Sequence, residues 1–247
     1  MTLPDIGQSD KSHRTGRPNP KAMSIKDICV VGDIHGEYRL LEKLINSISN
    51  TIKDMQYVFV GDYIDRGPDS EGVLDFLMEL NKSESCVFLK GNHEQMCLDA
   101  HTDPYGQSFY HWCSNGGTQT LESFELNRIP DKYLEWMKGL ETISATKDYI
   151  FVHAGLRPGI PYDQQSIQDK IWIRDLFLDS NYDWGKLVIH GHTPVNRIDV
   201  RPNRINIDTG AVFGGALTAL VLRPDGTKWA IQVINNPVML EVYKEEI

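Results

Sequence analysis

Side chains that bind metal ions recur in the turns that follow a series of apolar segments. Five of the eight histidines lie in these turns. The set comprises Asp33, His35, Asp62, Asp65, Asn92, His93, His153, His190 and His192. Ordinary turn chemistry explains one such residue. It does not explain why imidazoles and carboxylates return at successive turns, so the joint pattern indicates metal ligands.

The donor types restrict the metal. Carboxylate, amide oxygen and imidazole, without thiolate, suit manganese, iron or zinc and argue against copper(I) or an iron–sulfur cluster. The set offers more ligands than one tetrahedral ion uses and suits two ions that share a bridging carboxylate. Two divalent cations held by two aspartates keep a positive formal charge. Such a centre would bind a phosphate dianion despite the acidic surroundings.

The elements that must position these residues follow a regular rhythm. Apolar runs end at Asp33, Asp62 and Asn92, at intervals close to the about 30 residues of a strand–helix–parallel strand unit. An apolar stripe predicts a helix over 37–50, and Pro-Asp-Ser at 68–70 predicts the start of another. Because parallel strands end at one sheet edge, the three polar residues should lie close together.

The rhythm breaks over 99–147, which mixes aromatic residues with a glycine turn and a predicted helix around 131–139. We interpret this segment as an inserted cap. Strand-like runs then end at His153, His192 and Asp208, and we expect two more to close the chain as antiparallel strands. These last runs are LTALVL (217–222) and KWAIQVI (228–234). The predicted organisation is a mobile polar tail over 1–25 and one catalytic domain over 26–247.

Composition excludes several classes of protein. A hydrophobic content of 40% excludes disorder of the whole chain, and a net charge of −9 disfavours a nucleic-acid partner. The sequence shows no apolar stretch of the length of a membrane span and no apolar block of a signal peptide near residue 1. Four widely spaced cysteines predict free thiols in a reducing cytoplasm. Nothing in the pattern predicts an obligate protein partner.

Five short motifs occur in an order that resembles the phosphoprotein phosphatase family of Ser/Thr phosphatases, among the metallophosphoesterases. The resemblance is greatest to small bacterial and phage members and covers about 27–222. The motifs are GDIHG (32–36), GDYIDRG (61–67), GNHE (91–94), HAG (153–155) and GHT (191–193). The resemblance implies an α/β fold in which two packed β-sheets are flanked by helices, an αββα sandwich.

The same resemblance implies a ligand set for two divalent metal ions, with manganese the expected metal and iron or zinc left open. It implies that Asp33 and His35 bind one ion and that Asp62 bridges both. It assigns the second ion to Asn92, His153 and His192. His190 lies outside the motif position, so we expect it to support the site or the fold rather than to bind metal.

The resemblance also implies catalytic roles. His93 would protonate the leaving group and Asp65 would orient it, while a metal-bridging hydroxide attacks phosphorus in line. Arg66, Arg174 and Asn92 would bind the substrate phosphate. For Arg174 the alternative is a surface residue paired with Asp175.

Three further features remain open. For Glu94 we favour a carboxylate that supports the site or the start of a helix. Trp112, close to Asn115-Gly116-Gly117, would pack inside the cap or shape the substrate mouth. The turn at 208–210 resembles a family turn near the metals, without a ligand role for Asp208.

The predicted activity is hydrolysis of phosphomonoesters, foremost phosphoserine and phosphothreonine in proteins, with phosphotyrosine left open. The alternative is a phosphoric-anhydride hydrolase acting on dinucleoside tetraphosphates. Symmetrically cleaving enzymes of that type resemble this chain but typically carry alanine at the position of Asp65. An inactive binding module would show gaps among the motif residues, and the sequence has none.

Overall fold

The strands of the computed structural model form two sheets. The structure describes residues 26–52, 54–124, 128–234 and 241–245, so the tail predicted over 1–25 lies outside the described residues. The first sheet has the order β11-β10-β9-β1-β2-β3 and the second the order β4-β5-β6-β8-β7. Their bounds are β1 Ile28–Val31, β2 Gln56–Phe59, β3 Ser85–Phe88, β4 Ile143–Ala145, β5 Tyr149–Val152, β6 Leu187–His190, β7 Asp199–Val200, β8 Arg204–Asn206, β9 Leu217–Leu222, β10 Lys228–Val233 and β11 Glu241–Glu245.

Each sheet has a parallel centre. Strands β1, β2 and β3 pair in parallel, which confirms the two strand–helix–strand units predicted from the spacing. Strands β5, β6 and β8 are parallel in the second sheet. The predicted antiparallel pair is confirmed as β9 and β10, but β11 adds a strand that we did not predict.

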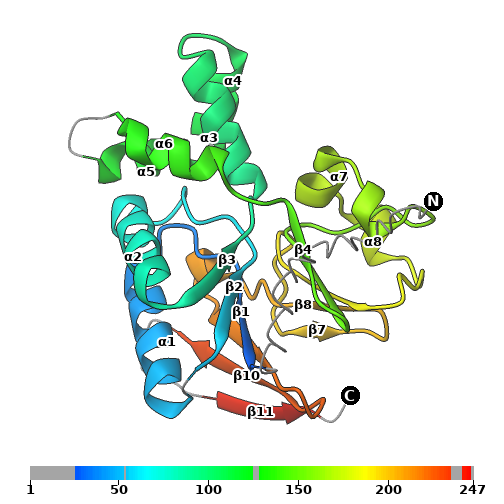
Figure 1. Cartoon of the computed structure of the whole chain (residues 1–247). Coiled ribbons are helices and arrows are strands. Elements are labelled where there is room, and N and C mark those ends of the chain that lie inside the picture. The colour runs from blue at the N-terminus through cyan, green and yellow to red at the C-terminus, as the bar shows by residue number, and fades with distance from the viewer. Residues whose placement is uncertain (1–25, 53, 125–127, 235–240, 246–247) are drawn as a thin grey trace, which may run out of the picture.

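Two amphipathic helices, α1 (Tyr38–Thr51) and α2 (Ser70–Ser83), cover the outer face of the first sheet (Figure 1). The predicted apolar stripe of α1 is buried, from Leu40 to Ile48. The α2 helix starts where predicted, because the Asp69 carboxylate accepts a hydrogen bond of 2.8 Å from the Gly72 N–H group.

The two sheets pack against each other through an apolar layer. Val30 and Val58 of the first sheet meet Phe151 and Ile189 of the second, while alternate residues of β1 and β2 face α1 and α2. On the outer face of the second sheet lie the short helices α7 (Ile167–Trp172) and α8 (Asp175–Leu178). This four-layer arrangement confirms the αββα fold.

The segment between β3 and β4 is helical and stands above the first sheet (Figure 1). It contains α3 (Asn92–Thr102), α4 (Gln107–Trp112), a π-helical turn (Cys113–Gly117), α5 (Thr118–Ser123) and α6 (Asp131–Lys138). The helix predicted around 131–139 is therefore present as α6. The cap predicted over 99–147 begins within α3 and ends just beyond β4.

The cysteines are free, as predicted. Cys29 is buried and Cys86 is partly buried. Among the described helices, none combines the length and apolar character needed to cross a membrane.

Candidate metal centre and active site

The predicted residues come together where the parallel strands of both sheets end. Turns after β1, β2 and β3 carry Asp33, Asp62 and Asn92, as the spacing predicts. Turns after β5 and β6 bring His153 and His192 from the second sheet to the same edge. Two sheets with no strand in common thus supply one cluster of buried polar side chains.

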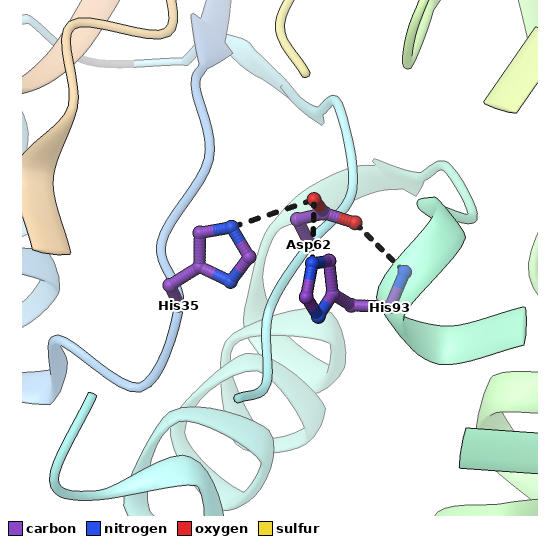
Figure 2. A group of neighbouring side chains, drawn as sticks. All are labelled: His35, Asp62 and His93. Carbon is purple, nitrogen blue, oxygen red and sulfur yellow. Dashed lines mark hydrogen bonds and ion pairs between the residues drawn. The ribbon is translucent and has the colours of Figure 1, made fainter. Parts of the chain in front are cut away.

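Asp62 lies at the centre of this cluster. One carboxylate oxygen is 3.4 Å from His35 Nε2 and 4.0 Å from His93 Nε2. The other accepts the His93 backbone N–H at 3.1 Å and lies 3.3 Å from His153 Nε2. Figure 2 shows the His35 and His93 rings both directed toward one oxygen of this carboxylate. A carboxylate with imidazoles on both sides is placed as a bridging ligand would be.

Backbone carbonyls fix which ring nitrogen faces the centre. His35 Nδ1 is 2.9 Å from the Ile64 carbonyl, and His153 Nδ1 is 3.0 Å from the Val60 carbonyl. Carbonyls only accept, so both Nδ1 atoms carry a hydrogen and the Nε2 atoms are the ones that face the centre. Metal-binding histidines are commonly oriented in this way.

The donor set fits divalent cations. Atoms that could bind a metal ion lie within 4.8 Å of one another in His35, Asp62 and His93, and likewise in Asp62, His153 and His192. The buried Asp33 Oδ1 and His192 Nε2 atoms have no hydrogen-bond partner within the described structure. Buried polar atoms of this kind are costly unless something binds them, and a cation would satisfy both.

The pKa values of the two central carboxylates, Asp33 and Asp62, are shifted in opposite directions. Burial and the neighbouring Asp208 carboxylate raise the pKa of Asp33 well above its ordinary value. Against the effect of burial, the imidazoles of His153 and His93 hold the pKa of Asp62 well below its ordinary value. Negative charge is therefore costly at Asp33, where a bound cation would relieve it.

The histidine environments differ as well. Burial lowers the pKa of His192 to about 2 and that of His35 to about 3, which keeps both rings neutral and able to bind metal. For His153, burial has the same direction, but the Asp62 carboxylate outweighs it and raises the pKa to about 9.

Glu94 holds the Asp62 turn through backbone contacts. Its carboxylate accepts hydrogen bonds from the N–H groups of Asp62 at 3.0 Å, Tyr63 at 2.8 Å and Gly91 at 2.9 Å. Gly91 must be glycine, because a Cβ atom there would lie 2.0 Å from Asp62 Oδ1. Glu94 thus has the supporting contacts that we favoured for it.

His93 and Asp65 form a short pair beside the centre. His93 Nδ1 is 2.6 Å from Asp65 Oδ2, and both side chains are buried. Burial raises the pKa of the Asp65 carboxyl to about 8 and lowers that of His93 to about 4. Burial therefore disfavours the charged form of each group, and the short hydrogen bond gives each buried group a polar partner.

The cap contributes two donors to this pair, which the sequence did not reveal. The Trp112 indole N–H lies 3.0 Å and 2.9 Å from the two Asp65 oxygens. The Thr120 hydroxyl donates to Asp65 Oδ1 at 2.6 Å. Trp112 therefore does more than pack inside the cap. Its place three positions before the Asn-Gly-Gly turn was the available signal, and Thr120 carried none.

The two arginines occupy different positions. Arg66 is partly buried, with Nη1 2.7 Å from His35 Nε2, so it lies directly at the centre. Arg174 is exposed at the start of α8, with Nη1 3.5 Å from Thr193 Oγ1. Within the described residues no ion pair joins Arg174 to Asp175, the alternative that we considered.

Backbone strain is concentrated at these residues. Five of the six non-glycine residues with positive φ in the described part of the chain belong to this site. They are His35, Asp62, Asp65, Arg66 and His192, with φ between 48° and 75°. Each such conformation costs about 1–3 kcal/mol and persists only where surrounding contacts impose it. Clustering of this kind is typical of functional sites.

A search of family models matches residues 26–223 to the calcineurin-like phosphoesterases. The chain belongs to this family. The chain is also 33% identical over 215 residues to Serine/threonine-protein phosphatase 1 of Salmonella typhimurium, covering 80% of this chain and 93% of that protein.

Other relatives of this calcineurin-like phosphoesterase carry different names. It is 29% identical over 221 residues to an asymmetrical bis(5′-nucleosyl)-tetraphosphatase of Anoxybacillus flavithermus, covering 77% of this chain and 88% of that protein. A crystal structure of a cold-active protein tyrosine phosphatase shares the fold, with a TM-score of 0.62 and 19% identity over 85% of this chain and 77% of that one. The family makes the chain a metallophosphoesterase hydrolase, and its relatives differ in substrate.

Two polar residues of this phosphoesterase remain outside the centre. His190 Nδ1 lies 3.1 Å from the Gly191 carbonyl, and its ring packs against Phe177 of α8, on the far side of the second sheet. Asp208 accepts the Gly210 N–H at 3.0 Å and so shapes its own turn. Neither contact is that of a metal ligand.

Proposed function

We propose that this phosphoesterase hydrolyses phosphomonoesters, foremost phosphoserine and phosphothreonine in proteins. The observation that carries the proposal is the buried contact of 2.6 Å between His93 and Asp65. An alkoxide is a poor leaving group and needs a positioned proton donor. A histidine held by a carboxylate beside a metal centre supplies one.

The ligand assignment follows the motif positions and the geometry. Two divalent cations, with manganese the metal we expect, would be held by Asp33, His35, Asp62, Asn92, His153 and His192. When bound, such cations lower the pKa of water and stabilise charge on phosphate oxygens. Asn92 Oδ1 lies 3.0 Å from His153 Nε2, so both can reach one cation.

The remaining steps belong to the chain's own side chains. Arg66 and Arg174 bind phosphate oxygens, and the partly buried position of Arg66 beside His35 makes it the stronger of the two. Asn92 contributes its amide to the same phosphate. His93 delivers a proton from Nε2 to the leaving oxygen, while Asp65 holds Nδ1 and so keeps the ring oriented.

A second candidate activity is the asymmetrical hydrolysis of dinucleoside tetraphosphates. The tetraphosphatase similarity supports it. So does Phe213, which is 64% exposed and whose ring centroid lies 5.5 Å from the Arg66 guanidinium carbon. An exposed aromatic face next to a phosphate-binding arginine offers a stacking surface for a nucleobase.

The test compares both substrates under one condition. Purified, manganese-loaded protein is given a phosphoserine/phosphothreonine peptide and, separately, a dinucleoside tetraphosphate with nucleotide products resolved. A chelator-treated sample is the control. We expect chelator-sensitive release of phosphate with a higher kcat/KM for the peptide. A higher kcat/KM for the dinucleotide would replace the first proposal by the second, and inactivity on both would refute both.

A further inference from the structure

The segment 112–120 encloses the Asp65–Arg66 dipeptide from the cap side; we name it the clasp segment. Trp112 and Thr120 donate to the Asp65 carboxylate. The Thr120 hydroxyl also accepts the Asp65 N–H at 2.8 Å and lies 3.0 Å from Ser70 Oγ. One residue of the clasp segment therefore contacts both the backbone and the side chain of Asp65.

These donors leave the Asp65 carboxylate one orientation. Oδ1 receives Thr120 and Trp112, and Oδ2 receives His93 and Trp112. A carboxylate offers about four lone-pair sites, and three donors engage them, with the single Trp112 N–H shared between both oxygens. Rotation of the group would break several buried hydrogen bonds at once, so the His93 ring is fixed through Asp65.

The clasp segment also holds the next residue along the chain. The Gly116 carbonyl accepts the Arg66 N–H at 3.0 Å, and Gly116 has a φ of 108°. A Cβ atom on Gly116 would lie 2.6 Å from Arg66 Cγ. Asp65 and Arg66 are both in the strained left-handed conformation, and these contacts are among those that impose it.

We propose that Trp112 and Thr120 are positioning residues for the proton transfer and act through Asp65 on His93. This inference rests on the proposed function, because it assigns the two residues to the protonation step of that reaction. It makes the cap part of the machinery that protonates the leaving group.

The test uses leaving groups of different basicity. Trp112→Phe keeps an aromatic ring and loses the N–H donor, and Thr120→Val keeps the shape and loses the hydroxyl. We expect each variant to lower kcat on an alkyl phosphate by about 10- to 100-fold. On p-nitrophenyl phosphate, whose leaving group needs little protonation, kcat should stay within about threefold. KM should change little on either substrate.

Matched controls are available in the same chain. The Trp184 indole donates to the Ile160 carbonyl at 3.1 Å and touches no residue of the centre, so Trp184→Phe removes a comparable hydrogen bond. Thr118 lies in the same helix as Thr120 and bonds to Gln119, so Thr118→Val is its partner control. Both controls should leave both substrates within about twofold of the unmodified protein. Equal losses on the two substrates in Trp112→Phe would show a merely structural role and overturn the inference.

A double-mutant cycle separates this inference from the proposed function. If Trp112 acts through Asp65, then Trp112→Phe adds no further loss in an Asp65→Ala background. His93→Asn reports on the function itself. A selective loss on the alkyl phosphate in His93→Asn, without one in Trp112→Phe, would refute the positioning role alone. No selective loss in His93→Asn would refute the assigned proton donor.

A spectroscopic measurement tests the contact without turnover. The chain has five tryptophans, and Trp112→Phe identifies the indole N–H signal of Trp112 in a nitrogen–proton spectrum. We expect Asp65→Ala to move that signal upfield and to leave the Trp184 signal in place. An unmoved Trp112 signal would show that the hydrogen bond is absent and would overturn the inference.

Discussion

The strand-end turns and the clasp segment both reach the His93–Asp65 pair, but they are built differently. The turns present residues at nearly equal spacing from parallel strands, and backbone carbonyls and Glu94 orient them. The clasp segment crosses a π-helical turn and reaches Asp65 with two side chains that are far from it in sequence. We infer that repetition in the fold creates the candidate metal-binding edge and that an irregular insertion completes the proposed proton donor.

The largest expected effect lies at the strand-end turns. Asp62→Asn removes the charge that three imidazoles surround and should weaken metal binding by more than the about 10- to 100-fold that follows loss of a supporting residue. Turnover should disappear at manganese concentrations that saturate the unmodified protein. Elemental analysis and a manganese titration measure this, and full occupancy of two ions in the variant would contradict a bridging role.

The next largest effect is expected at His93, which both regions contact. His93→Asn should lower kcat on an alkyl phosphoester by about 10²- to 10⁴-fold, the range for loss of a general acid. Because His93 is not one of the assigned metal ligands, metal content should be kept. Steady-state kinetics with metal analysis of the same sample distinguishes the roles, and loss of the metals would place His93 among the ligands instead.

A third variant tests whether the strand-end turns need the hydrogen bonds that the Glu94 carboxylate accepts from their backbone. Glu94→Gln places an amide N–H₂ against backbone N–H groups and removes a buried carboxylate acceptor. We expect the free energy of unfolding to fall by about 1–3 kcal/mol. Urea denaturation checks this, with Glu79→Gln on the exposed face of α2 as the control. Equal midpoints for the two variants would show that the turn holds its shape without Glu94.

The smallest effect is expected at the exposed arginine. Arg174→Ala should raise KM for a phosphopeptide by about tenfold, as loss of one hydrogen bond to a charged group would, and change kcat little. Arg66→Ala, at the partly buried position, should raise KM by more. Initial-rate kinetics over substrate concentration compares the two, and identical kinetics for Arg174→Ala and the unmodified protein would remove Arg174 from the phosphate site.

The sequence predicted the parallel centre of the first sheet because hydrophobic runs and the spacing of Asp33, Asp62 and Asn92 are local signals. It also predicted an antiparallel pair near the end of the chain. It did not predict β11, because its run Glu241–Glu245 is mostly charged or polar and takes its place by pairing with β10. Edge strands of this kind depend on a neighbour rather than on their own pattern.

The candidate site divides in the same way. Motif order supplied the residues that the structure brings to one edge, and the resemblance supplied their roles, which remain predictions. The Thr120–Asp65 contact joins residues 55 positions apart. The left-handed backbone at Asp65 and Arg66 has no sequence signal either, since neither residue is glycine. Both features depend on long-range packing that no local pattern encodes.

The candidate ligand residues come from two sheets that share no strand. Asp33 of the first sheet accepts the His192 N–H of the second at 3.0 Å, and Asp62 meets His153 across the same junction. Cations bound there would take ligands from both sheets and so stabilise the packing of one sheet against the other. A cation at 100 times its dissociation constant would add about 2.7 kcal/mol to the free energy of unfolding. The melting temperature should then rise with the concentration of free manganese, so that thermal unfolding measures how fully the sites are occupied.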